Sequence, residues 1–179
     1  MQFNLVPHPA NPPSEPPFKV WVNVEHSAAF SATATTNIWF GIGAPATRFV
    51  MPEVLEPIRA ANLWESTCFE AFLRVPGADA YREWNFAPSS AWAAYDFSSH
   101  RDGRTEPEVA TPYIRVEDNM TWWALGATIT MDAKSVFEVG LSAILEEKDG
   151  TKSYWALAHP EESEKADFHD PACFAAHLP

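Results

Sequence analysis

The chain has 179 residues, of which 46% are hydrophobic and 20% are charged, and its formal net charge is −12. This length fits a single domain, and the hydrophobic fraction is sufficient for a sizeable core. The acidic balance argues against nucleic acid and against an anionic membrane surface as partners, because both attract clusters of Lys and Arg.

The N-terminal region is rich in proline, with six prolines between residues 7 and 17. Proline favours an extended backbone, so we expect residues 1–17 to be a lead-in and residues 18–179 to form the domain. The first residues lack the basic start and apolar run of a targeting signal, and no stretch approaches the ~20 apolar residues of a membrane span. Cys68 and Cys173 are far apart and match no Cys-x-x-Cys motif. These features together predict a cytoplasmic protein with reduced thiols.

From residue 18 onward, hydrophobic residues recur with a period close to two, which is the period of a β-strand. The expected strands cover residues 18–24, 37–42, 67–75, 81–87, 92–97, 113–117, 121–131, 136–146 and 154–158. We expect a loop or one short helical turn at 52–62 and a short helix at 171–176. About nine to ten strands at regular spacing indicate an all-β fold, an antiparallel β-sandwich of the jelly-roll or immunoglobulin-like kind.

The segment 67–75 is the clearest central strand. Its alternation places Phe69, Ala71 and Leu73 on one face and Cys68, Glu70 and Phe72 on the other. A carboxylate on a buried strand must be paired or hydrogen-bonded. Two interpretations of Glu70 therefore stay open: a salt bridge to Arg82 or Arg101, or an acceptor that faces a ligand.

Motifs of the common enzyme classes are absent from the sequence. It contains no Gly-x-Ser-x-Gly elbow, P-loop, dinucleotide-binding glycine motif or His-Glu-x-x-His motif. We therefore expect no catalytic residue and no cofactor. A segment with His159, Asp167, His169 and Asp170 has the residue types of a metal site but no defined zinc spacing, so packed histidines or a polar rim are the preferred interpretation.

Aromatic and polar side chains are concentrated in one part of the chain. Within 38 consecutive positions lie Trp64, Glu70, Tyr81, Trp84, Asn85, Trp92, Tyr95 and Arg101. A pyranose has an apolar C–H face that stacks on an aromatic ring, and hydroxyls that form charge-assisted hydrogen bonds. This combination of residue types favours a sugar-binding site.

Five segments together carry a resemblance to a known family. They are LWESTCFEAF (63–72), WNFAPS (84–89), WAAY (92–95), SYWALAHP (153–160) and DFH (167–169). They look like the bacterial DOMON-like domain proteins, which are similar to the family-nine carbohydrate-binding modules. The resemblance spans roughly residues 15–178. It implies an antiparallel β-sandwich with a ligand site at one sheet face, and members of the wider superfamily bind sugars or haem.

The resemblance also implies particular ligand-binding residues. In the sugar-binding modules a tryptophan lies six residues before a strand glutamate and both contact the sugar, and Trp64 and Glu70 have that spacing here. An arginine and an asparagine also contact sugar in those modules, and Arg101 and Asn85 are the candidates. We add Trp92 from the same region. The late region offers the aromatic residues Phe168 and His169 where the modules have a second sandwiching tryptophan.

The leading hypothesis is a non-catalytic domain that binds a carbohydrate or a similar polyhydroxylated small molecule. A protein-interaction or structural domain with a repurposed site is one alternative. A haem-binding domain is another, for which a Met and a His ligand would come from Met51, Met120, Met131, His159 and His169. A glycan hydrolase is the third, and it requires Glu65, Glu83 or Asp96 within roughly 5–10 Å of Glu70.

Overall fold

The computed structural model describes residues 1–27, 33–132, 136–161 and 163–178. Eleven strands and three short 3₁₀ helices lie within them. The strands are β1 (Gln2–Pro7), β2 (Val20–Ser27), β3 (Thr33–Ile42), β4 (Cys68–Arg74), β5 (Tyr81–Phe86), β6 (Trp92–Phe97), β7 (Tyr113–Asp118), β8 (Trp123–Asp132), β9 (Phe137–Glu146), β10 (Lys152–Ala156) and β11 (Ala176–Leu178). The helices are η1 (Ala46–Arg48), η2 (Leu63–Glu65) and η3 (Pro171–Cys173). Among the described helices none has the length and hydropathy of a membrane span.

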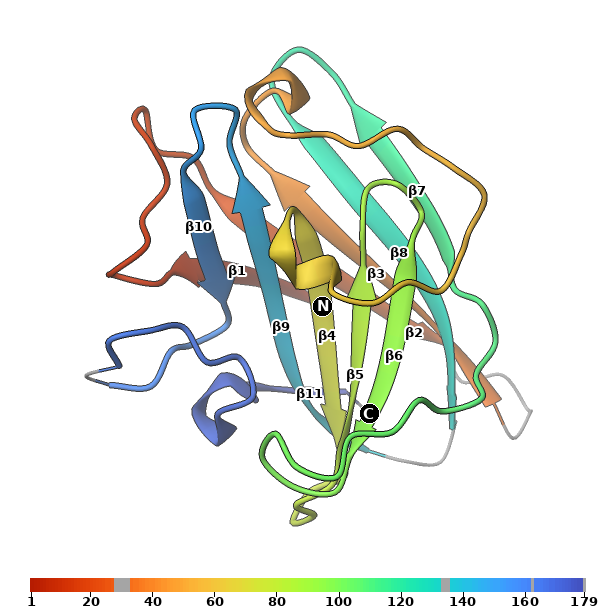
Figure 1. The fold of residues 1–179 in the computed structure, drawn as a ribbon. Helices are drawn as coiled ribbons and strands as arrows, with labels where there is room; N and C mark the ends of the chain where they lie inside the picture. The colour runs from red at the N-terminus through yellow and green to blue at the C-terminus, as the bar shows by residue number, and fades with distance from the viewer. Residues whose placement is uncertain (28–32, 133–135, 162, 179) are drawn as a thin grey trace.

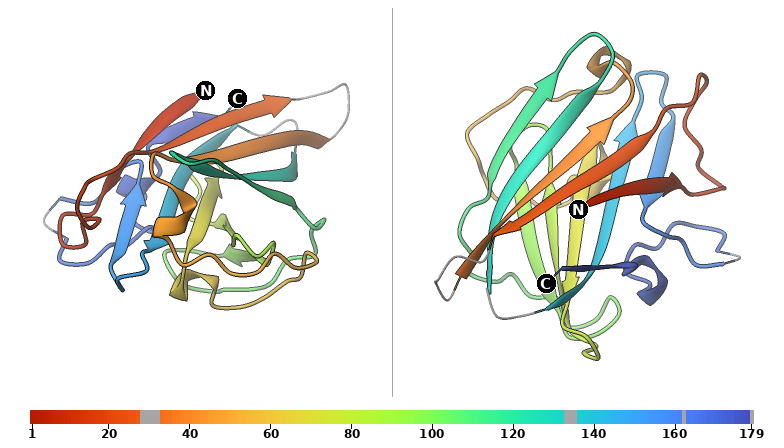
Figure 2. Two further views of the ribbon diagram at one scale, coloured as in Figure 1. Left: turned by 90° about the horizontal axis from the view of Figure 1, so that it is seen from above. Right: turned by 180° about the vertical axis from the view of Figure 1, so that it is seen from behind.

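The strands form one antiparallel path that curls into two layers. The order is β6-β5-β4-β9-β10-β1-β2-β3-β8-β7, and β11 pairs with β9. We call β6-β5-β4-β9-β10 the front layer and β2-β3-β8-β7 the back layer, as they lie in Figure 1, and Figure 2 shows both from other sides. Strand β1 belongs to both layers, because Leu5 pairs with Val20 of β2 and Val6 pairs with Ala156 of β10. The predicted all-β, antiparallel fold is confirmed.

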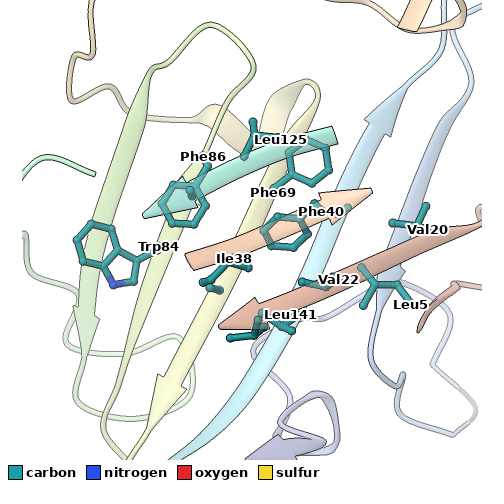
Figure 3. Close-up of a cluster of buried hydrophobic side chains, with 14 of the residues drawn as sticks. Leu5, Val20, Val22, Ile38, Phe40, Phe69, Trp84, Phe86, Leu125 and Leu141 are labelled. Atoms are coloured by element: carbon teal, nitrogen blue, oxygen red, sulfur yellow. The ribbon is translucent and has the colours of Figure 1, made fainter. Parts of the chain in front are cut away.

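The main core lies between the two layers (Figure 3). Phe69, Phe86 and Leu141 of the front layer and Phe40 and Leu125 of the back layer are at most 1% exposed. Burying a side chain of this size contributes about 1.5–3 kcal/mol. Because strand side chains alternate, the residues between these core positions point to the two outer faces of the molecule.

The outer face of the front layer carries a second, smaller hydrophobic cluster. Phe72, Tyr81 and Phe97 of the strands pack there against Phe168 and Phe174 of the C-terminal segment, by which we mean residues 157–161 and 163–175. An antiparallel sheet of this kind commonly leaves one face to water. Here the C-terminal segment covers part of that face and bounds a recess on it.

All nine predicted strands are present, with ends that differ by a few residues. The predicted alternation in 67–75 is also correct, since Phe69 and Leu73 belong to the main core and Phe72 belongs to the outer cluster. Cys68 and Cys173 are free and buried, as expected for reduced thiols.

Two short strands at the chain ends differ from the predictions. Residues 2–7 of the expected lead-in form β1, because Leu5 is buried in the core and the backbone pairs on both sides. The prolines begin only at Pro7, so the extended region without strand pairing is shorter than predicted. At the other end the expected helix is limited to η3, which the side chain of Asp170 caps by accepting a hydrogen bond from the Ala172 backbone, and β11 follows it.

Candidate ligand-binding pocket

The outer face of the front layer is hollowed where a row of mostly small side chains crosses it. Strand register places Ala93, Asn85, Glu70, Ser142 and Ala156 side by side on β6, β5, β4, β9 and β10. The short side chains on either side of Glu70 leave space above it. The resulting pocket has a volume of about 430 Å³, which is in the range of small-molecule sites.

Four parts of the chain meet around this pocket: the front-layer strands, η2, the loop that follows β6 and the C-terminal segment. The lining side chains are Trp64, Glu70, Glu83, Tyr95, Phe97, Arg101, Arg104, Ile144, Tyr154, Ala166, Phe168 and His169. The set combines six aromatic or histidine rings with two carboxyl and two guanidinium groups.

Glu70 and Glu83 are diagonal neighbours on the pocket floor, since Glu70 pairs with Asn85 and Glu83 pairs with Phe72. The Ser142 hydroxyl donates a hydrogen bond of 2.8 Å to Glu70 Oε2. Burial, with a further contribution from the charge of Glu83, raises the pKa of Glu70 to about 8. Glu70 therefore holds a proton near neutral pH, so it can donate a hydrogen bond as well as accept one.

The second carboxyl group has its own buried support. The Asn85 side-chain amide donates a hydrogen bond to Glu83 Oε1, and its carbonyl accepts a weak one from the Cys68 thiol. Burial raises the pKa of Glu83, while the Asn85 hydrogen bond and the charge of Arg101 act in the opposite direction. Asn85 itself is fully buried, so it positions Glu83 from beneath the pocket.

The loop after β6 brings positive charge to the pocket. Arg101 has a backbone φ of 56°, a left-handed conformation that costs a non-glycine residue about 1–2 kcal/mol. Its backbone N–H donates to the Tyr81 hydroxyl, and its guanidinium donates to Asp167 Oδ1 at 2.7 Å. Burial raises the pKa of Asp167, but the hydrogen bond and the positive charge of the Arg101 guanidinium outweigh it, so the pKa is lowered. The same contacts fasten the β6 loop to the C-terminal segment.

His169 lies between the Tyr81 hydroxyl, to which it is hydrogen-bonded, and the carboxyl group of Glu83. The Tyr81 hydroxyl accepts a hydrogen bond from the Arg101 backbone N–H and lies 2.7 Å from His169 Nδ1, to which it can donate its own proton. With Tyr81 as the donor, the proton of the neutral ring is on Nε2, which lies 3.5 Å from Glu83 Oε2. Burial and the charge of Arg101 lower the pKa of His169 to about 4, so the ring is neutral at neutral pH.

Aromatic rings supply the apolar part of the pocket. The rings of Trp64 and Tyr95 meet edge to face with centroids 6.3 Å apart, and those of Tyr154 and Phe168 meet at 6.3 Å. The Arg104 guanidinium packs over the Tyr95 ring, 5.0 Å from its centroid. Trp64 and Tyr154 keep part of their surface open to solvent. They are therefore the rings that a ligand can reach first.

The structure brings together five of the seven predicted ligand-binding residues. The residues that line the pocket are Trp64, Glu70, Arg101, Phe168 and His169, while Asn85 lies beneath it. Trp92 is the exception: it is 4% exposed and packs in the main core against Trp84, because its position on β6 points between the layers. The assignment of Trp92 as a ligand-binding residue is wrong. Arg104 was missed, although it lies in the same short loop as Arg101.

The ion pairs of Arg82 and Arg101 decide between the two interpretations of Glu70, a salt bridge or a ligand-facing acceptor. Arg82 pairs with Asp96 at 2.6 Å and Arg101 pairs with Asp167 at 2.7 Å, and neither is within ion-pair distance of Glu70 among the described residues. The salt-bridge interpretation is therefore wrong, and Glu70 faces the pocket.

The alternatives of a metal site and of a haem site depend on where their His, Asp and Met candidates lie. Within the described residues no three His, Cys, Asp or Glu side chains are placed to hold a metal ion. Met131 is buried in the main core and Met120 is 92% exposed, and neither lines the pocket that holds His169. A Met–His pair of haem ligands is not assembled at this pocket.

No protein-family model matches the sequence, and no curated protein matches it. Solved structures with a similar fold do exist. One is a "putative carbohydrate-binding protein" from Bacteroides uniformis, 14% identical, with a TM-score of 0.63 over 97% of this chain and 83% of that one. Another is a family 9 carbohydrate-binding module from Caldicellulosiruptor kristjanssonii in complex with cellotriose, 6% identical, with a TM-score of 0.51 over 88% of this chain and 74% of that one. The chain therefore has the β-sandwich fold of the family 9 carbohydrate-binding modules, as the resemblance predicted.

Proposed function

We propose that the pocket binds a saccharide, or a similar polyhydroxylated molecule, without changing it chemically. One observation carries this proposal: two buried carboxyl groups, Glu70 and Glu83, open into the same recess as the partly exposed ring of Trp64. A sugar offers what such a recess needs, since its C–H face stacks on an indole and its hydroxyls bond to carboxyl groups.

The protonation states support the same ligand class. A hydroxyl both donates and accepts, and the pocket floor holds a protonated Glu70 next to Glu83 and the neutral imidazole of His169. Arg101 and Arg104 add donors at the rim. A pocket with mixed donors and acceptors favours neutral polyols over ligands that carry a full charge. The fold shared with a module that holds cellotriose, and the sequence resemblance to DOMON-like domains, agree with this proposal.

Calorimetric titration with glucose, cellotriose and maltotriose tests the proposal. We expect at least one of them to bind, and Trp64→Ala and Glu70→Ala each to weaken the affinity at least about tenfold, or about 1.4 kcal/mol. Tyr113→Ala is the matched control, because Tyr113 is an aromatic residue on β7 that is 64% exposed and lies outside the pocket. Binding that is unchanged in Trp64→Ala, or absent with a wider glycan panel, would contradict the assignment.

A second candidate, glycan hydrolysis, has one observation in its favour. Glu70 and Glu83 are diagonal neighbours, a relation that places the two residues ~7–8 Å apart, and both have a raised pKa. Glycosidases use two carboxyl groups at roughly 5–10 Å. Under the binding proposal, prolonged incubation with cellotriose releases no new reducing ends. Release that disappears in Glu83→Gln would assign the hydrolytic function instead.

A further inference from the structure

The outer face of the back layer carries a second concentration of aromatic side chains. Trp21 of β2, Trp39 of β3 and Trp122, just before β8, are all partly exposed there. Together with Asn23 and Glu117 they bound a recess of about 260 Å³, which we call the tryptophan hollow. The back layer is seen from this side in the right-hand view of Figure 2. The front-layer pocket lies on the opposite face of the molecule.

Glycines beneath the rings hold two of these tryptophans flat on the sheet. A Cβ added to Gly126 would lie 2.8–2.9 Å from three alternate carbons of the six-membered ring of Trp39, so this ring is centred over the glycine. A Cβ added to Gly41 would lie 2.2–2.5 Å from three atoms of the Trp21 indole. No other side chain could occupy either position without moving the ring. The sheet therefore fixes the rings from below and keeps the entropy cost of ligand binding low.

The surroundings of the rings differ in a way that points to Trp21 and Trp122 as the contact surfaces. The Arg115 guanidinium packs over Trp39, 4.3 Å from the ring centroid, and also lies 3.7 Å from Glu117. In contrast, neither Trp21 nor Trp122 has an aromatic or cationic partner in the part of the chain that the structure describes. Their indole N–H groups likewise have no hydrogen-bond partner there.

The size and the boundary of the tryptophan hollow favour a sugar-sized ligand over a protein partner. The recess covers two rows of the sheet, and the next row carries the polar residues Glu25, Asn37 and Thr128 together with the exposed Tyr113. A stable protein interface needs about 800 Å² on each partner with an apolar centre. A recess of about 260 Å³ holds one or two sugar-sized rings, and Asn23 and Glu117 at its edge can bond to hydroxyls.

We propose that the tryptophan hollow is a second saccharide-binding site, in which sugar rings stack on Trp21 and Trp122 and bond to Asn23 and Glu117. It stands on different residues from the front-layer pocket and does not depend on the function proposed for that pocket. Two sites on opposite faces would allow one molecule to contact two glycan chains, or two separated parts of one chain, which strengthens attachment through effective concentration.

Fluorine NMR of protein labelled with 5-fluorotryptophan tests the two sites separately. The chain has eight tryptophans, and single Trp→Phe variants assign their signals. The probes are cellotriose, maltotriose, xylotriose and mannotriose, titrated to millimolar concentration. Trp64 reports on the pocket, Trp21 and Trp122 report on the hollow, and the fully buried Trp84 and Trp123 serve as internal references.

We expect at least one probe to shift the Trp21 and Trp122 signals saturably, and the shift to persist in Trp64→Ala protein. Trp21→Ala should weaken the titration of the Trp122 signal about tenfold, and the unmoved Trp84 signal confirms that the variant is folded. Trp122→Ala, read out at Trp21, is an independent second variant. The proposal is overturned if Trp21 and Trp122 stay unmoved by all four probes, or if cyclohexanol shifts them as strongly as the sugars do.

Discussion

Replacing Glu70 with glutamine should stabilise the protein relative to the wild type, and this difference should grow as the pH rises. Burial raises the pKa of Glu70 from 4.5 to about 8. Below about pH 4.5 the carboxyl is protonated in both the folded and the unfolded chain and makes no difference. Between about pH 4.5 and 8 the folded protein retains a proton that the unfolded chain has released, so the free energy of unfolding falls as the pH rises. Glutamine has the same shape, accepts the Ser142 hydrogen bond and never ionises.

The size of the effect follows from the shift. A rise from 4.5 to about 8 corresponds to at most roughly 5 kcal/mol. Because Glu83 shares the same buried environment, part of this energy belongs to the pair, and we expect Glu70→Gln to be about 2–3 kcal/mol more stable than the wild type at pH 8. At pH 4 the two proteins should unfold at nearly the same denaturant concentration.

Urea denaturation at intervals between pH 4 and pH 9 measures this difference directly. Glu53→Gln, which removes an exposed carboxylate, controls for the change in net charge. Parallel profiles of the wild type and Glu70→Gln would contradict this prediction, because Glu70 would then be ionised at no cost in the folded state. A stability advantage of Glu70→Gln over the wild type that is smaller at pH 8 than at pH 4 would also contradict it.

Three further variants test other contacts. Arg48→Ala leaves the carboxylate of Glu147, which is 1% exposed, without its ion pair, and should lower the free energy of unfolding by about 3 kcal/mol in urea denaturation. Trp92→Ala opens a cavity in the main core and should cost about 3–5 kcal/mol by the same measurement, whereas Trp92→Phe should retain ligand binding. Arg101→Gln releases Asp167 from its ion pair, and limited proteolysis should then cut the C-terminal segment faster than in the wild type.

The strands could be predicted from the sequence wherever hydrophobic residues alternate over enough positions to identify the two faces. In β4 the pattern of Phe69 and Leu73 on one side and Phe72 on the other identified both faces correctly. Alternation did not identify β1, which runs into the proline-rich segment, or β11, which has only three residues. Strand β1 pairs with two strands that are far apart in the sequence, since Gln2 lies opposite Asn23 and Val6 lies opposite Ala156. No local pattern contains that information.

The site was predictable in its residue types and less so in its geometry. Spacing and resemblance selected Trp64 and Glu70, and both line the pocket. The assignment of Trp92 failed because alternation along β6 decides which face of the sheet its side chain takes. Its cross-strand partner is Phe86, and both side chains point into the core. The partners of Arg101 could not be inferred either, since Asp167 is 66 residues away along the chain.

The two candidate sites share one physical origin. The core needs large side chains at inward positions, but it places no demand on the outward positions of the same strands. On the front layer Ala93 and Ser142 stand beside Glu70, and on the back layer Gly41 and Gly126 lie beneath tryptophan rings. Small outward residues in the middle of a sheet bury little surface and stabilise it less than larger residues would. Their presence at both recesses is therefore explained by the space that they leave above the sheet, where a ligand can lie against fixed rings.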